Sequence, residues 1–265
     1  MSVDAAQAIG TEPNETASVH RRYADLGLSW WPVLLFLPAR TVLSYVSQAV
    51  TAGILWATGN PQPWQSSTGW WMVYGTLTDV SCLLLLTWLV RRERLRLFDL
   101  LGLQRAGIVQ QLRSGLLYVL ACVPVVAIST IVARLFYGDE LVPQVAAIHT
   151  PGWATGYSIA VWPVIWGFTE ELVYLGYLLP RIEAMTGRTW LSAALVVLMW
   201  GLQHAVIPYI PDGKYLVARV VGALIVVGGM TLIFLLGRRR IISAMIVHYV
   251  ADFGAAISAL TLPRR

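Results

Sequence analysis

The sequence predicts an all-α polytopic transmembrane helical bundle with about seven spans (seven or eight). Of its 265 residues, 57% are hydrophobic and 12% are charged, whereas soluble domains carry roughly 25% charged residues. Long apolar runs also recur along most of the chain. Because lipid offers the backbone no hydrogen bonds, only helices and closed barrels span a bilayer, and these runs are too long for barrel strands.

Seven apolar runs approach or exceed the ~20 residues that cross the hydrocarbon layer of a membrane. They cover residues 30–57, 69–90, 112–136, 153–179, 190–208, 216–236 and 241–260. The first run is interrupted by Pro32, Pro38 and Arg40, and the region 91–111 leaves room for an eighth element on the surface. Residues 1–29 are polar and predict a disordered N-terminal tail, so residues 30–265 are expected to form a single transmembrane domain.

Basic residues cluster beside alternate spans, which orients the bundle. The clusters are His20-Arg21-Arg22, Arg91 to Arg96, Arg181 with Arg188, and Arg238-Arg239-Arg240. The opposite loops, 58–68 and 137–152, contain no Lys or Arg. The positive-inside rule therefore predicts an integral membrane protein with a cytoplasmic N-terminus, and the arginine-rich, lysine-poor composition favours a bacterial cell membrane. Anionic lipid headgroups account for the net charge of +5, so membrane lipids are expected partners and nucleic acid is not.

Ionisable side chains inside three of the runs mark a candidate site. Glu170 and Glu171 lie within run 153–179, His204 lies within run 190–208, and His248 and Asp252 share run 241–260. Such groups are costly in lipid and usually face a polar cavity, so they indicate function. Taken singly, His204 reads equally well as a structural hydrogen-bonding residue, and His248 with Asp252 as a structural pair four residues apart.

The rise of a helix places these groups at similar depth. Counted from the arginine-bearing ends, Glu170 lies roughly 16 Å deep and His204 roughly 22 Å deep. His248 and Asp252 lie roughly 12 Å and 18 Å deep on one face of their helix. The three helices are therefore expected to bring their polar groups together near the midplane of the membrane.

These residues resemble the motifs of the CPBP intramembrane proteases, the family of the type II CAAX prenyl endopeptidases and the bacteriocin-immunity (Abi) proteins. The first motif reads Glu170-Glu171-Leu172-Val173-Tyr174-Leu175-Gly176, the second Trp200-Gly201-Leu202-Gln203-His204, and the third His248-Tyr249-Val250-Ala251-Asp252. The segment 91–103 also looks like the stretch that precedes the core of these proteins. The resemblance covers residues 90–260 and implies a catalytic core at about 112–260.

Two positions depart from the family pattern. Leu175 stands where the family usually has arginine, which removes a cationic partner for one of the glutamates. Asp252 stands where asparagine is common, and an ionised aspartate accepts hydrogen bonds but donates none. Asp252 is therefore expected to orient a histidine or bind a metal ion.

The resemblance implies hydrolysis of a peptide bond in a membrane-embedded or lipid-linked polypeptide. Glu170 is then the general base for a water molecule, and His204 and His248 stabilise the oxyanion or protonate the leaving amine. Asp252 orients a histidine, and Glu171 holds the site in shape or binds the substrate backbone. The alternative uses Glu170, His204, His248 and Asp252 as candidate ligands of a divalent metal such as zinc, although no HExxH helix is present.

Two other classes of function remain open from the sequence. An ion-coupled transporter would also gather acids and histidines at the midplane, but no repeated halves are visible. A catalytically weakened immunity or scaffold protein is compatible with Leu175. Among the other intramembrane charges, Arg40, Asp79 and Arg134 are expected to pair between helices or reach the interface, and Arg219 to snorkel to the membrane surface.

Overall fold

The computed structural model describes residues 13–103 and 107–261, and every regular element in these ranges is a helix. The long helices are α4 (Ala39–Ala57), α6 (Trp71–Arg92), α7 (Ile108–Tyr137), α12 (Thr189–Gln203), α13 (Gly213–Leu236) and α14 (Ile241–Thr261). The shorter ones are α2 (Pro13–Asp25), α3 (Trp31–Phe36), α5 (Pro63–Ser67), η1 (Thr68–Trp70), η2 (Leu97–Leu101), α8 (Pro143–Ala146), α9 (Gly152–Ala160), α10 (Trp162–Glu171), η3 (Leu172–Leu178), α11 (Leu179–Thr186) and η4 (His204–Val206). The predicted all-α polytopic bundle is confirmed.

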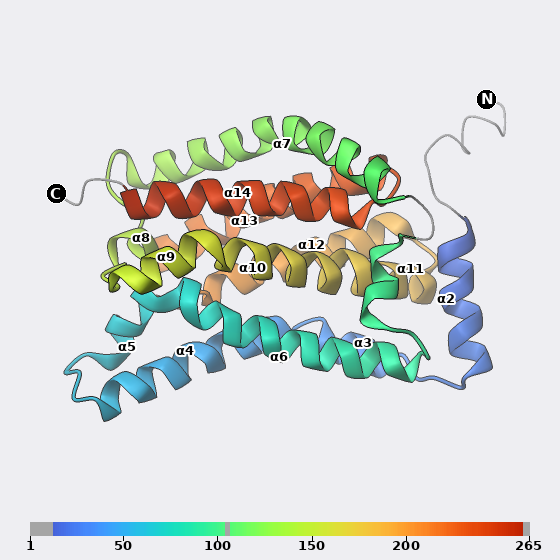
Figure 1. The fold of residues 1–265 in the computed structure, drawn as a ribbon, viewed down its shortest axis with the longest axis horizontal. Coiled ribbons are helices and arrows are strands. Elements are labelled where there is room, and N and C mark those ends of the chain that lie inside the picture. Colours follow the sequence, from blue (N-terminus) through green and yellow to red (C-terminus); the bar gives the residue numbers. More distant parts are fainter. Residues whose placement is uncertain (1–12, 104–106, 262–265) are drawn as a thin grey trace.

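Five stretches are long and apolar enough to cross a membrane by length and composition. They are Pro63–Arg92, Ile108–Tyr137, Thr189–Val206, Gly213–Leu236 and Ile241–Leu260. The other two predicted spans are interrupted helices that run alongside these in the bundle (Figure 1). The count of seven spans therefore stays an interpretation, and the region 91–103 supplies only the short helix η2.

Prolines account for the interruptions. Pro38 separates α3 from α4, and Pro163 lies in the first turn of α10, just after the break at Val161. Proline has no N–H to donate and clashes with the preceding turn, so it starts helices more readily than it continues them. The predicted span 153–179 is consequently built from α9, α10 and η3 in succession.

Helix α10 occupies the centre of the bundle, where it packs against α6 on one side and α14 on the other. Helix α4 lies against α6, α7 packs on α13 and α14, and α12 packs on α13. These helices run along the long axis of the molecule in Figure 1. The bundle therefore surrounds the helix that carries the glutamate pair.

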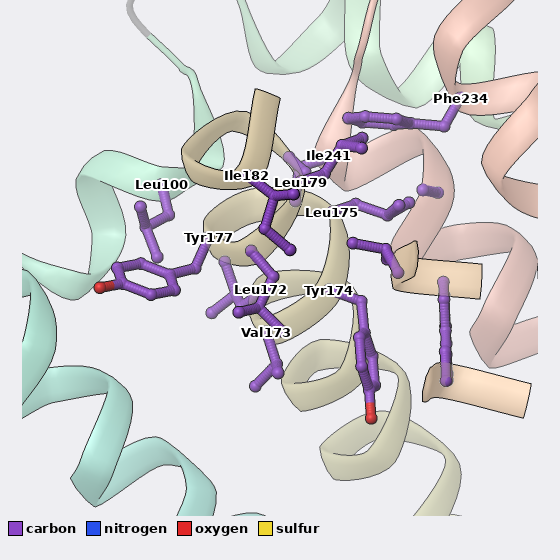
Figure 2. Packing of buried hydrophobic residues seen from close by; sticks show 14 of the residues in the cluster. Leu100, Leu172, Val173, Tyr174, Leu175, Tyr177, Leu179, Ile182, Phe234 and Ile241 are labelled. Atoms are coloured by element: carbon purple, nitrogen blue, oxygen red, sulfur yellow. The ribbon is translucent and has the colours of Figure 1, made fainter. Parts of the chain in front are cut away.

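The segment that follows the glutamate pair is a π-helix, η3. All seven of its residues are buried, and Figure 2 shows the side chains of Leu172, Val173, Tyr174, Leu175 and Tyr177 packed in an apolar cluster. Leu175 lies in this cluster with Ile241 and Phe234. A π-helical turn is rare and frequently marks a functional site.

The outward face of α7 is apolar and exposed, as expected of a surface that meets lipid. Its exposed side chains include Leu112, Leu116, Leu117, Leu120 and Val123. An apolar exposed surface of this extent on a soluble monomer would be unusual, so it supports a membrane location.

Helix α2 crosses one end of the bundle, so the expectation of a disordered tail was wrong for residues 13–25; residues 1–12 lie outside the described residues (Figure 1). Tyr23 stacks on Trp30 with ring centroids 3.9 Å apart, and its hydroxyl donates to Glu93 at 3.1 Å. Arg181 binds the same carboxylate through two nitrogens at 3.0 Å and 2.6 Å. Arg181, which the sequence indicated only as part of a topology signal, is 2% exposed and paired with Glu93.

Charge neighbours set the ionisation of this cluster. Burial alone would raise the pKa of Glu93, but Arg181 and Arg22 outweigh it, and the pKa is lowered. Burial, followed by the nearby Glu93 charge, raises the pKa of Tyr23 to about 12. At neutral pH, the cluster therefore contains an ionised carboxylate and a neutral phenol that donates to it.

Candidate active site

Glu170 lies in the last turn of helix α10, at the centre of the bundle, and is completely buried. Its Oε1 atom accepts hydrogen bonds from Arg40 Nε at 3.0 Å and from Gln203 Nε2 at 2.6 Å. Its Oε2 atom accepts one from Trp200 Nε1. Donors from α4 and α12 therefore fix this carboxylate and satisfy a charge that would otherwise be costly in the interior.

Arg40 is the cation that compensates this carboxylate. It is 1% exposed, pairs with Asp79 of α6 as well as with Glu170, and lies 4.7 Å from the ring centroid of Trp166. The expected interhelical pairing of Arg40 and Asp79 is confirmed. The sequence argument that Leu175 deprives the glutamates of a cation is corrected for Glu170, because α4 supplies one.

His248 of α14 lies among three carboxylates. Its Nδ1 is 3.1 Å from Glu171 Oε1, and its Nε2 is 3.4 Å from Asp252 Oδ2 and 3.7 Å from Glu170 Oε2. Gly167 permits this approach, because a Cβ there would lie only 3.3 Å from the His248 Cβ. Carboxylates on both sides of the ring would stabilise a positively charged imidazolium.

His204 begins η4, at the point where α12 ends. Its Nδ1 lies 2.9 Å from the carbonyl oxygen of Trp200. A carbonyl oxygen only accepts hydrogen bonds, so Nδ1 carries the hydrogen and Nε2 keeps a free lone pair. Nε2 makes no hydrogen bond or ion pair with another side chain in the described part of the chain, so it can accept a hydrogen from a ligand.

A cavity of about 270 Å³ joins these groups. Glu170, His204, His248 and Asp252 line it, together with residues of α6, α7, α8, α10, α13 and α14. The convergence predicted from helix rise is therefore present: Glu170, Glu171, His248 and Asp252 are linked by contacts below 4 Å, and His204 opens on the same space.

Sequence reasoning missed the supporting residues of the site. Arg40 and Asp79 stood out as charges in apolar runs, but their runs lie outside the motifs and gave no sign that they reach Glu170. Gln203 was quoted only as a spacer before His204, yet it donates to Glu170 and accepts from the Tyr174 hydroxyl at 2.7 Å. A polar residue of this kind in an apolar run is the signal that would have found it.

Arg219 differs from its expected position. Instead of snorkelling to the membrane surface, it lines the cavity, with its Nη2 3.4 Å from the carbonyl oxygen of Ile207. Its guanidinium carbon lies 5.9 Å from the ring centroid of Trp71. Arg219 therefore adds a positive charge to a cavity that carboxylates also line.

The arrangement of side chains around Glu170 does not favour a bound metal ion. No three His, Cys, Asp or Glu side chains in the described ranges are arranged to hold an ion. The Arg40 guanidinium also lies 3.0 Å from Glu170 Oε1, where it would repel a bound cation. Zinc at this site therefore stays a prediction, which metal analysis of the purified protein would test.

Comparison with known proteins agrees with the motifs. Residues 151–254 match the family model described as type II CAAX prenyl endopeptidase Rce1-like. Neither the curated proteins nor the solved structures gave a match. The matched segment contains Glu170, Glu171, His204, His248 and Asp252, and all of these except Glu171 also line the cavity. This match and the five stretches that are long and apolar enough to cross a membrane support an integral membrane protein whose residues 151–254 resemble the Rce1-like region of the type II CAAX prenyl endopeptidases.

Proposed function

We propose that the protein is an intramembrane endopeptidase that hydrolyses a peptide bond of a membrane-embedded or lipid-linked polypeptide. The observation that carries the proposal is the 3.7 Å separation of Glu170 Oε2 and His248 Nε2 beside a cavity that also reaches His204. A general base and a general acid must both come within hydrogen-bonding reach of one reacting water and one peptide bond. The family description, which names prenyl endopeptidases, supports a lipid-linked substrate.

Glu170 is suited to be the base because one of its lone pairs remains available. Oε1 is occupied by Arg40 and Gln203, whereas Oε2 accepts only from Trp200. A carboxylate offers about four lone-pair sites, so Oε2 can accept a water hydrogen as well. His204 Nε2 would accept the other hydrogen, which directs the water oxygen at the scissile carbonyl.

His248 is suited to be the acid. Glu171 accepts from Nδ1 and thereby turns Nε2 toward Glu170 and Asp252. In the imidazolium form, Nε2–H donates to the oxyanion that forms when the carbonyl is attacked. Glu171 and Asp252 act as positioning residues for this ring.

The steps balance as a hydrolysis. The water oxygen bonds to the carbonyl carbon while Glu170 takes one water proton. The tetrahedral intermediate then collapses, the carbon–nitrogen bond breaks, and the amine nitrogen takes a proton from His248. Proton transfer from Glu170 to His248 restores the starting state, and the products are a carboxylic acid and an amine.

The test uses the full chain in liposomes with a membrane-anchored peptide, and mass spectrometry of the products. We expect Glu170→Gln and His248→Ala each to slow cleavage by ~100-fold or more, the usual contribution of an acid or base. Glu140→Gln, in the exposed loop after α7, is the matched control and should cleave at the wild-type rate. Wild-type cleavage by both site variants would refute the proposal. If the wild type binds a polypeptide but does not cut it, and Glu170→Gln binds it equally well, a scaffold role is favoured.

A further inference from the structure

The chain that follows His204 is buried although it is not helical. Helix α12 ends at Gln203, η4 is a single turn, and Ile207 has an extended backbone with φ −136° and ψ 91°. Ile207 and Pro208 are both buried. Backbone groups that are buried outside a helix need hydrogen-bond partners from elsewhere in the protein.

Side chains of two other helices supply these partners. The carbonyl oxygens of residues 207–209, here called the exit segment, each accept a hydrogen bond from a side chain. Arg219 of α13 donates to the first at 3.4 Å, Tyr215 of α13 to the second at 3.2 Å, and Gln48 of α4 to the third at 3.1 Å. The exit segment is therefore held from α4 and from α13 at once.

Gln48 binds the exit segment in both directions. Its Nε2 atom donates to the Tyr209 carbonyl oxygen at 3.1 Å, and its Oε1 atom accepts from the Tyr209 N–H at 2.7 Å. The same Oε1 atom accepts from the Tyr74 hydroxyl of α6 at 3.2 Å, and Gln48 is completely buried. An amide that both donates to and accepts from one residue fixes that residue along the segment as well as its distance from α4.

The exit segment begins three residues after His204, so its position constrains the His204 ring. Three residues span at most ~10 Å even when extended, which leaves little slack between the two. Helix η4, which His204 begins, also contacts α4 and α13, the two helices that hold the exit segment. On the other side, the Trp200 carbonyl oxygen lies 2.9 Å from Nδ1 of the ring.

We propose that Gln48 is a positioning residue for His204: by binding Tyr209 it holds the exit segment, and thereby keeps Nε2 of His204 facing the cavity. Gln48 does not itself line the cavity, so its effect on the reaction passes through another residue. This inference rests on the proposed function for its place in the reaction, where His204 accepts a water hydrogen. The orientation of the ring can be measured without cleavage.

The test variant is Gln48→Met, which keeps the length of the side chain and removes both hydrogen bonds with Tyr209. The Tyr209 ring keeps its contact with Tyr45 of α4, at 5.7 Å between centroids, so the exit segment should stay docked and the protein folded. The matched control is Thr51→Val on the same helix, because the Thr51 hydroxyl donates to the Ser47 carbonyl oxygen within α4.

The first readout is cleavage of the membrane-anchored peptide by the full chain in liposomes. Gln48→Met should lower kcat by ~10- to 100-fold and change KM by less than ~3-fold, because a displacement of ~1 Å can cost ~100-fold in the reaction while the substrate contacts stay. Thr51→Val should match the wild type in both constants. In a His204→Ala background, adding Gln48→Met should lower the rate by less than ~2-fold, because the residue through which it acts is already gone.

The second readout is NMR of the histidine ring nitrogens, which needs no substrate. The chain has four histidines, and the signals lost in His204→Ala identify those of His204. We expect wild type and Thr51→Val to carry the hydrogen on Nδ1, with Nε2 unprotonated, as the Trp200 carbonyl requires. Gln48→Met should show a mixture of the two tautomers, because the loosened ring no longer keeps this hydrogen bond.

A wild-type kcat in Gln48→Met would overturn the proposal, and so would a single, unchanged tautomer of His204 in that variant. A loss of rate as large in the His204→Ala background as in the wild type would show that Gln48 acts through the fold at large, which also overturns it. If Gln48→Met does not fold, Gln48→Asn, whose amide is one methylene too short to reach Tyr209, is subject to the same expectations. If the tautomer changes as expected and no peptide is cut by the wild type, the positioning role of Gln48 stands and the proposed protease activity falls.

Discussion

Removing the Arg40 side chain should disable the protein, because this one cation compensates two buried carboxylates. Arg40→Met would leave Glu170 without the two guanidinium nitrogens that lie 3.0 Å from it, and Asp79 without its partner. Breaking a buried ion pair from one side costs ~3–5 kcal/mol, since the remaining charge is stranded. If Glu170 takes up a proton to avoid that cost, it can no longer act as a base, and cleavage should fall by ~100-fold.

A double variant separates the two effects. Asp79→Asn added to Arg40→Met removes one stranded carboxylate, so it should recover ~0.5–3 kcal/mol of stability, the range of coupling between contacting residues. It should not recover cleavage, because Glu170 still lacks its guanidinium donors. The assays are thermal unfolding in detergent and cleavage in liposomes.

The matched control is Arg134→Met, which removes an exposed arginine of α7 and should stay within ~0.5 kcal/mol of the wild type. Wild-type stability and wild-type cleavage in Arg40→Met would refute the reasoning. A double variant no more stable than the single one would show that Asp79 is not stranded when Arg40 is lost.

Three further outcomes are expected. Gln203→Leu removes the hydrogen bond that Gln203 donates to the buried Glu170 carboxylate at 2.6 Å, so the free energy of unfolding should fall by ~1–3 kcal/mol. In the cleavage assay kcat should fall more than KM changes, and an unaltered kcat would contradict a positioning role. Gly167→Val should separate α10 from His248 and lower both melting temperature and cleavage, whereas Gly156→Val, where a Cβ meets no atom within 4 Å, should change neither. The pKa of Glu93 is lowered in the folded protein, so the stabilisation of the fold by ionised Glu93 is present above the ordinary glutamate pKa of ~4.3 and is lost as the pH falls through the lower folded pKa. Limited proteolysis should therefore release α2 only in acid. Release of α2 at neutral pH would contradict this.

The convergence of the site could be predicted because it depends on a fixed quantity. The rise of a helix sets the depth of Glu170, His248 and Asp252 once the ends of the spans are known, and the structure places them within 4 Å of one another through His248. Composition alone was enough to predict a helical bundle, because a backbone within lipid must satisfy its hydrogen bonds internally.

The supporting contacts could not be predicted, because they join helices that are distant in sequence. Arg40 and Glu170 are separated by 130 positions, and no local sequence pattern shows that α4 and α10 lie close enough for these two side chains to pair. The docking of α2 through Tyr23 and Glu93 is equally non-local. The interruption at Pro38 was predicted from the sequence, because proline rarely continues a helix, whereas the apolar composition of run 153–179 masked the break before Pro163.

The wide turn of η3 has a consequence for how this chain tolerates insertions and deletions. A π-helical turn holds about one residue more than the α-helical turn it replaces, so removing one residue from Leu172–Leu178 would convert the segment to regular α-helix and leave the helices on either side in place. Arg181 would keep its contact with Glu93, and the helix would keep the anchor that joins it to α2. A one-residue deletion within α10 would instead rotate everything after it by about 100° and turn Arg181 away from Glu93, so it should be tolerated far less than a deletion in η3.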